Sequence, residues 1–239
     1  TVVDLGDYRF GFPVRVTAST CAGDEGLLNI EREVELSGPI HDKGVLILHS
    51  HLSSLFAHIA PLAMDAAVVF EQEYSGVEGD SASCAEFYAL LSSLSGAPLQ
   101  QGIAVTGAVN QRGELLPVGG INEKIEGYFR SCKCLGLTGL QGVLMPRRNL
   151  RHLMLDEQVV QAVAAGQFHI HVADTASEGM ALLTGMPYGE MGSGGYEANS
   201  VLGRAQKTLQ RFRRACEQLD HKPALKPNHR RHLGRDIDR

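Results

Sequence analysis

The spacing of apolar residues changes repeatedly along this chain between two periods, and this alternation constrains the fold more than any other feature. Segments in which every second residue is apolar, and brief apolar runs bounded by Gly, Pro, Asn or Asp, are typical of strands. Longer segments with apolar residues three or four positions apart are typical of helices that bury one face. Strands are therefore expected over residues 8–19, 27–36, 66–70, 103–109, 114–118, 142–146 and 168–172.

Helices are expected over residues 45–59, 83–95 and 176–184, and another helix should open at Gly119-Gly120. Because strands and helices are interleaved along the sequence, the pattern predicts an α+β (mixed α/β) fold. A chain of 239 residues with 44% hydrophobic residues can bury a sizeable core. The turn-rich residues 185–195 indicate a boundary, so we expect one domain over residues 1–190.

Residues 191–239 are expected to form a basic C-terminal extension that is partly helical or disordered. Residues 201–219 read as one amphipathic basic helix, and the remainder has the composition of a disordered tail. From Val201 onward the chain carries eleven Lys and Arg residues against four Asp and Glu, although the whole chain has a net charge of −5. Since interleaved aromatic residues are absent, we expect nonspecific contact with nucleic acid at most. No core positions are predicted after Tyr196.

Composition and motifs argue against several classes of protein. Five cysteines at irregular spacing, without a signal peptide, favour a reducing compartment, so a cytoplasmic location is expected. Neither Cys132 and Cys134 nor the histidine pairs at positions 49 and 51 and at 169 and 171 have the arrangement of a metal site. The sequence has no apolar run of membrane-spanning length and no P-loop. Because it begins with Thr1 as if in mid-domain, we expect a piece of a longer protein.

Residues 77–86, VEGDSASCAE, contain two serines that invite different interpretations. Ser83, followed three positions later by Glu86 and then by an apolar periodic run, has the pattern of a capping box. Ser81 follows Asp80, and Ser and Asp are the residues that any helix start prefers. Taken alone, the segment therefore favours a helix start over a catalytic nucleophile.

Residues 116–124, LPVGGINEK, place Lys124 in the first turn of an expected helix. The positive end of the helix dipole and burial both disfavour the charged form, so both lower the pKa of a lysine at this position. Such a lysine can act as a general base. The alternative is a solvated lysine beside Glu123.

These two segments, EGDSAS and IAVTGAVNQRGELLPVGGINEK, closely resemble the proteolytic domain of the Lon proteases. The hallmark of that family is a serine in a Gly-x-Ser-Ala segment and a lysine in Gly-Gly-x-x-Glu-Lys. Here the lysine follows the serine by 43 positions, which is the family spacing. The resemblance includes SGPIHDKG and extends from about the first strand to Pro187, and EGDSAS is similar to the archaeal type (B) and its bacterial relatives.

The resemblance implies a Lon proteolytic-domain fold of the ribosomal protein S5 domain 2-like class. It also implies that Ser81 is the nucleophile and Lys124 the general base of a Ser-Lys dyad. Asp80 and Glu78 are expected to support the site, although the family commonly has an aspartate at the position of Glu78. Thr106 matches a family threonine placed to hydrogen-bond the lysine amine; otherwise it is a strand threonine with a satisfied hydroxyl.

The resemblance further implies a serine endopeptidase that degrades unfolded or regulatory proteins in protein quality control. A fused AAA+ motor that uses ATP and Mg²⁺ is expected outside this chain, and a hexameric ring is expected for the assembly. No cofactor and no metal are expected in this domain. The alternatives are a catalytically silent Lon-like scaffold of a larger ATPase, and a protein that binds nucleic acid through the basic tail.

Overall fold

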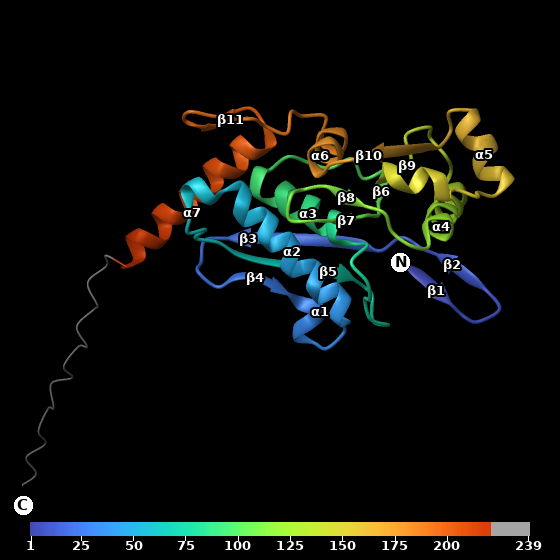
Figure 1. Cartoon of the computed structure of the whole chain (residues 1–239), viewed down its shortest axis with the longest axis horizontal. Coiled ribbons are helices and arrows are strands. Elements are labelled where there is room, and N and C mark those ends of the chain that lie inside the picture. Colours follow the sequence, from blue (N-terminus) through green and yellow to red (C-terminus); the bar gives the residue numbers. More distant parts are fainter. Residues whose placement is uncertain (221–239) are drawn as a thin grey trace, which may run out of the picture.

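The computed structural model describes residues 1–220 and has the mixed α+β architecture that the apolar spacing predicts. A mixed sheet contains β3 (Arg15–Cys21), β5 (Asp65–Glu71) and β4 (Gly26–Asn29) in that order, with β3 antiparallel and β4 parallel to β5. A parallel sheet has the order β10 (His169–Ala173), β9 (Gly142–Pro146) and β6 (Ile103–Val105). Figure 1 shows the first sheet beside α2 (Pro39–Leu55) and α3 (Ser83–Ser95), and the second beside α4 (Ile121–Leu135).

Shorter elements connect and flank these sheets. Three two-stranded hairpins pair β1 with β2, β7 with β8, and β11 with β12. Their strands are β1 (Val2–Asp4), β2 (Arg9–Gly11), β7 (Ala108–Val109), β8 (Leu115–Leu116), β11 (Met191–Gly192) and β12 (Gly195–Tyr196). The remaining helices are α1 (Ile30–Glu33), α5 (Glu157–Ala164), α6 (Ala176–Thr184) and α7 (Val201–Asp220), with 3₁₀ turns η1 (Ala57–Ile59) and η2 (Arg147–His152).

The core is organised around α3, which is buried on most of its surface. Phe87, Leu90 and Leu91 of this helix lie in one apolar cluster with residues of β5, α2, α6 and α7. A helix that is apolar on most sides has to be surrounded by other elements. A second cluster joins Ile125 of α4 to Phe168 and to Val143 and Met145 of β9. The two clusters fix α3 and α4, whose N-terminal ends carry the serine and lysine segments.

Two predicted helices are confirmed with their expected boundaries. The helix α3 covers Ser83–Ser95 and ends at Gly96, which has a left-handed φ of 65° that a glycine adopts without strain. The helix α6 covers Ala176–Thr184, as predicted. The expected helix over residues 45–59 is real but begins earlier, with Pro39 in its first turn, and ends at Leu55.

Three predicted strands are wrong in extent. The strand expected over residues 8–19 is divided into β2 and β3, and Pro13, which has no N–H for a strand ladder, lies in the gap. The strand expected over residues 27–36 ends at Asn29 and continues as α1, where the buried Glu31 carboxylate accepts a hydrogen bond from Phe70 N–H at 2.7 Å. The strand expected over residues 103–109 is interrupted at Thr106 and Gly107 between β6 and β7.

The C-terminal part of the description also corrects an expectation. The helix predicted over residues 201–219 is confirmed as α7. The expectation that no core positions follow Tyr196 is wrong, because one face of α7 lies in the main apolar cluster through Val201, Leu202, Ala205 and Leu209. The division of the chain at residue 190 stays a prediction. Residues 221–239, for which the sequence predicts disorder, lie outside the described residues.

Candidate active site

Ser81 lies in the turn that leads into α3, and the break between β6 and β7 holds this turn in place. The Ser81 carbonyl accepts a hydrogen bond from Gly107 N–H at 2.8 Å and a longer one from the Thr106 hydroxyl at 3.4 Å. In return, the Gly107 carbonyl accepts a hydrogen bond from Cys84 N–H at 3.1 Å. Gly107 can make these contacts because its backbone leaves the strand ladder at this point, whereas Thr106 N–H still donates to the Leu144 carbonyl at 3.0 Å and only its hydroxyl reaches Ser81.

Lys124 reaches the same place from the first turn of α4. Its Nζ lies 2.8 Å from Ser81 Oγ and 3.2 Å from Thr106 Oγ1. The structure therefore brings together three of the predicted site residues from three separate segments. The predicted contact of Thr106 with the lysine amine is present, but Thr106 lies in the break between strands and not within one.

The surroundings of Lys124 lower the pKa of its ammonium group. Burial lowers the pKa of the Lys124 ammonium, and the nearby carboxylates of Asp80 and Glu123 oppose this effect without cancelling it. The pKa of Lys124 is therefore lowered overall, which is the direction that the sequence predicts. A lysine with a lowered pKa, 2.8 Å from a serine hydroxyl, can accept the proton of that hydroxyl.

The two predicted supporting carboxylates have different surroundings. Asp80 precedes Ser81 and packs against α2, where a Cβ built on Gly44 would lie 3.2 Å from the Asp80 Cβ. Its charge acts on Lys124. Glu78 is exposed, and its carboxylate lies beside Gly38 just before α2, without a hydrogen bond to another residue between positions 1 and 220. The structure therefore brings Asp80 to the site and leaves Glu78 at its edge.

The predicted capping box at Ser83 and Glu86 is wrong. The residue that caps α3 is Ala82, and no side chain supplies a capping hydrogen bond. Ser83 is buried, and its hydroxyl accepts a hydrogen bond from Val109 N–H at 3.0 Å. Glu86 is also buried and pairs with His41, for which the sequence predicts no role. In the sequence, His41 is marked out only by its place in SGPIHDKG, a segment that is part of the family resemblance.

Backbone donors lie close to Ser81. The N–H groups of Ser83 and Cys84 are occupied, since they donate to the carbonyls of Asp80 and Gly107 at 3.1 Å each. The N–H groups of Ser81 and Ala82 donate to no acceptor within the described part of the chain. Free backbone donors beside a nucleophile can stabilise an oxyanion.

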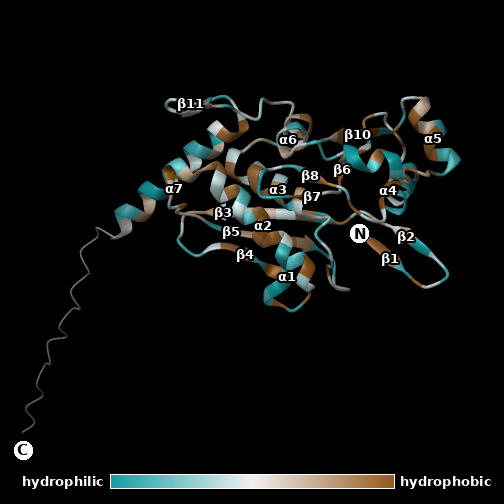
Figure 2. Cartoon of the chain, viewed as in Figure 1, coloured by the Kyte–Doolittle hydropathy of each residue, from teal (hydrophilic) through white to brown (hydrophobic). Residues whose placement is uncertain are grey.

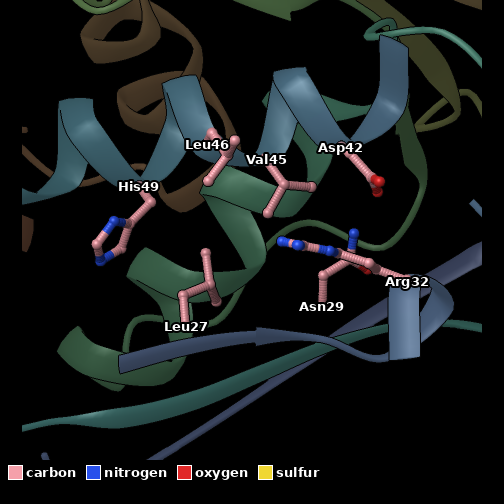
Figure 3. A pocket seen from close by; sticks show the side chains of 7 residues that line it. All are labelled: Leu27, Asn29, Arg32, Asp42, Val45, Leu46 and His49. Carbon is pink, nitrogen blue, oxygen red and sulfur yellow. The ribbon is translucent and has the colours of Figure 1, made fainter. Parts of the chain in front are cut away.

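The other candidate residues do not form a site with this trio. Over residues 1–220, no group of three or more His, Cys, Asp or Glu side chains is arranged to hold a metal ion. His51 is buried and hydrogen-bonds to the Gln111 carbonyl at 3.1 Å. His49 lies in a cavity of about 70 Å³ between α2 and the β4–α1 segment, whose lining contains none of the predicted catalytic or supporting residues (Figure 3). None of the helices in the described region has the length and apolar character needed to span a bilayer.

Comparisons with known proteins identify relatives of the segments that form this site. Residues 74–184 match the family described as the Lon protease (S16) C-terminal proteolytic domain. The chain is 45% identical over 174 residues to a protein of Escherichia coli strain K12 named "Putative Lon protease homolog", which covers 73% of this chain and 30% of that protein. A protein of the same name from Haemophilus influenzae is 42% identical over 176 residues, which is 74% of this chain and 29% of that protein.

A more distant relative is the Archaeal Lon protease of Archaeoglobus fulgidus, which is 39% identical over 95 residues, covering 40% of this chain and 14% of that protein. The chain thus spans less than a third of the length of each of these relatives. The family match over residues 74–184 contains Ser81, Thr106 and Lys124.

Proposed function

Because the chain belongs to the family of Lon protease C-terminal proteolytic domains, we propose that it is a serine endopeptidase with a Ser81–Lys124 dyad. The observation that carries the proposal is the 2.8 Å distance between Lys124 Nζ and Ser81 Oγ. A serine hydroxyl is a weak nucleophile unless a neighbouring base removes its proton. Burial lowers the pKa of Lys124, which supports its proposed role as that base.

In the first half of the proposed reaction, neutral Lys124 accepts the proton of Ser81 while Oγ attacks the peptide carbonyl carbon. We propose that the N–H groups of Ser81 and Ala82, which donate to no acceptor within residues 1–220, stabilise the resulting oxyanion. The C–N bond then breaks, and the Lys124 ammonium gives its proton to the leaving amine. In the second half, Lys124 deprotonates the water that hydrolyses the acyl-enzyme, and Ser81 regains its proton.

Thr106 has a defined part in this proposal, because its hydroxyl lies between the base and the nucleophile's backbone. It accepts a hydrogen bond from Lys124 Nζ at 3.2 Å and can donate to the Ser81 carbonyl at 3.4 Å. An amine that donates to Thr106 turns its lone pair away from that contact. The lone pair is then free to face Ser81 Oγ.

For the longer protein we propose ATP-dependent degradation of unfolded or regulatory polypeptides in the cytoplasm. A fused AAA+ module would bind ATP and Mg²⁺, and a hexameric ring would enclose the proteolytic sites. The support is that the relatives carry Lon protease names and are more than three times as long as their match to this chain. The Ser81–Lys124 contact favours this enzyme over a silent Lon-like scaffold, since a scaffold has no need of a paired nucleophile and base.

The test is hydrolysis of unfolded protein and of fluorogenic peptides by the wild-type protein and by Ser81→Ala. Ser81→Ala should lower the rate by about 10³-fold or more with little change in thermal unfolding. Ser83→Ala is the matched control, two positions away. It should keep the activity but lose about 1–3 kcal/mol of stability, because Val109 N–H would be left without its acceptor. Equal hydrolysis by Ser81→Ala and the wild type would remove Ser81 from the mechanism.

A further inference from the structure

A buried ion pair connects α2 to the first turns of α3. His41 Nε2 lies 3.2 Å from Glu86 Oε1, and the side chains are only 1% and 2% exposed. In such surroundings water screens the two charges very little, so each depends on the other for compensation. Breaking a pair of this kind by removing one partner is more costly than replacing both.

Within residues 1–220, the pair has few other polar partners. His41 Nδ1 and Glu86 Oε2 are both buried without a hydrogen bond. The Phe70 ring from β5 packs against the imidazole in a T-shaped arrangement, with ring centroids 5.5 Å apart. The other charged groups that act on His41 are Asp42 on α2 and Glu31 on α1. Burial lowers the pKa of His41, but Glu86 together with these two carboxylates outweighs burial and raises it above the ordinary value.

The same face of α2 lies directly against the serine turn. One turn after His41, a Cβ built on Gly44 would lie 3.2 Å from the Asp80 Cβ and 3.9 Å from the Ser83 Cβ. On the other side of the pair, Glu86 N–H donates to the Ala82 carbonyl at 3.1 Å. The ion pair and the Gly44 contact therefore enclose residues 80–83 between α2 and α3, and Ser81 lies within that segment.

We propose that His41 and Glu86 are positioning residues for Ser81: their ion pair holds α2 against the serine turn and thereby sets the distance between Ser81 Oγ and Lys124 Nζ. This inference rests on the proposed peptidase function. Neither side chain contacts the Ser81–Lys124–Thr106 trio by a hydrogen bond. The pair acts through the backbone of the turn, so its loss should lower kcat and leave KM nearly unchanged.

The experiment compares His41→Gln, Glu86→Gln and the double variant with the wild-type protein in peptide hydrolysis. Each single variant should lose about 10- to 100-fold in kcat, since an error of about 1 Å in the placement of a reacting group costs about this much. The double variant should be more active than His41→Gln, because Glu86 is then no longer a buried charge without a cation. His51→Gln is the matched control, since His51 is also buried on α2 but bonds to a backbone carbonyl.

The pH profile provides a readout that a merely structural role would not move. The pair is present while His41 is protonated and is lost as the pH rises through the raised pKa of His41. The wild-type kcat should therefore fall on the alkaline side of its maximum, and this fall should be absent in the double variant.

Single variants that keep wild-type kcat, or a His51→Gln variant that loses as much, would overturn the inference. If the single variants do not fold, a wild-type kcat that rises with pH without an alkaline fall would overturn it as well. A wild-type protein that hydrolyses no peptide at any pH would overturn the peptidase proposal too, so the two failures can be told apart.

Discussion

Lys124 combines two requirements that conflict in a folded protein: it must be buried enough to lose its proton and still reach Ser81. Burial lowers its pKa, and Asp80 and Glu123 limit the shift. Because the pKa is lower in the folded than in the unfolded chain, the unfolded chain binds the proton more tightly. Folding stability should then rise with pH between the two pKa values. The buried amine is thus a cost in stability that the proposed chemistry requires.

The proposed role of Lys124 requires that it can lose its positive charge. Lys124→Arg should be as inactive as Lys124→Met, because a guanidinium stays charged and cannot accept the serine proton. Lys124→Met should be at least as stable as the wild type near neutral pH, since it removes a half-buried cation. Peptide hydrolysis and thermal unfolding of the two variants measure both effects. Substantial hydrolysis by Lys124→Arg would show that this residue holds an ion pair and is not the base.

The acidic side of the wild-type pH–activity profile gives an independent check on Lys124. Activity should rise with pH through one ionisation that lies below the usual pKa of lysine, because only neutral Lys124 can take the proton. Asp80→Asn should move this side of the profile to lower pH, since the Asp80 carboxylate raises the pKa of Lys124. If the acidic side of the profile does not move in Asp80→Asn, the Asp80 carboxylate does not raise the pKa of Lys124.

For single residues, the resemblance allowed the contacts among Ser81, Lys124 and Thr106 to be predicted, but the capping role predicted for Ser83 is wrong. Ser81, Lys124 and Thr106 could be selected because two motifs at a fixed separation are specific. The hydrogen bond of the Ser83 hydroxyl could not be predicted, because its partner, Val109 N–H, lies in β7, 26 positions later in the sequence. A capping box is a local pattern, and a buried hydroxyl is used by whichever backbone donor the tertiary fold brings to it.

Among the elements, the break between β6 and β7 is the feature that the apolar pattern conceals. Residues 103–109 are almost all apolar or β-branched, which is typical of one continuous strand. In the structure, Thr106 N–H still binds the Leu144 carbonyl at 3.0 Å, but the Gly107 backbone turns to the serine segment. A Cβ on Gly107 would lie 3.1 Å from Cys84 Sγ. The need for close approach to α3, which is not visible in the local sequence, decides where the strand ends.

A second close approach connects β2 to the helix that carries the lysine. A Cβ added to Gly127 on α4 would overlap the carbonyl oxygen of Gly11 at the end of β2. Alanine normally favours a helix over glycine by about 1 kcal/mol. Here we predict the opposite: Gly127→Ala should cost about 1–3 kcal/mol, as overpacking does, and should lower hydrolysis by shifting α4 and Lys124.

Chemical denaturation and peptide hydrolysis of Gly127→Ala measure these two effects. Arg130→Ala is a suitable control, because Arg130 is exposed on the same helix. A Gly127→Ala variant that is more stable than the wild type would show that β2 does not restrain α4.

On the scale of the whole molecule, α7 changes the interpretation of the C-terminal residues. Figure 2 shows hydrophobic and hydrophilic residues alternating along this helix, as expected for a helix with one buried face. The amphipathic pattern could be predicted from the sequence, but not the surface that the apolar face would cover. In the structure that surface includes α3, because Val201, Leu202 and Leu209 join the cluster around Leu90 and Leu91. The basic side chains Arg204 and Lys207 remain exposed.

This packing implies that α7 stabilises the domain. A chain that ends at Tyr196 should be less stable by several kcal/mol, because each fully buried Val or Leu side chain contributes about 1.5–3 kcal/mol. Leu202→Ala, which removes one of these side chains from α7, should cost about 2–5 kcal/mol. Lys207→Ala on the exposed face should stay within about 0.5 kcal/mol of the wild type. Thermal unfolding of the truncated chain, Leu202→Ala and Lys207→Ala, each compared with the wild type, measures these effects.

Since α3 begins beside Ser81, the truncated chain should also lose peptide hydrolysis, because α3 would no longer be packed against α7. A truncated chain with wild-type melting temperature and hydrolysis would show that α7 rests on the domain without stabilising it.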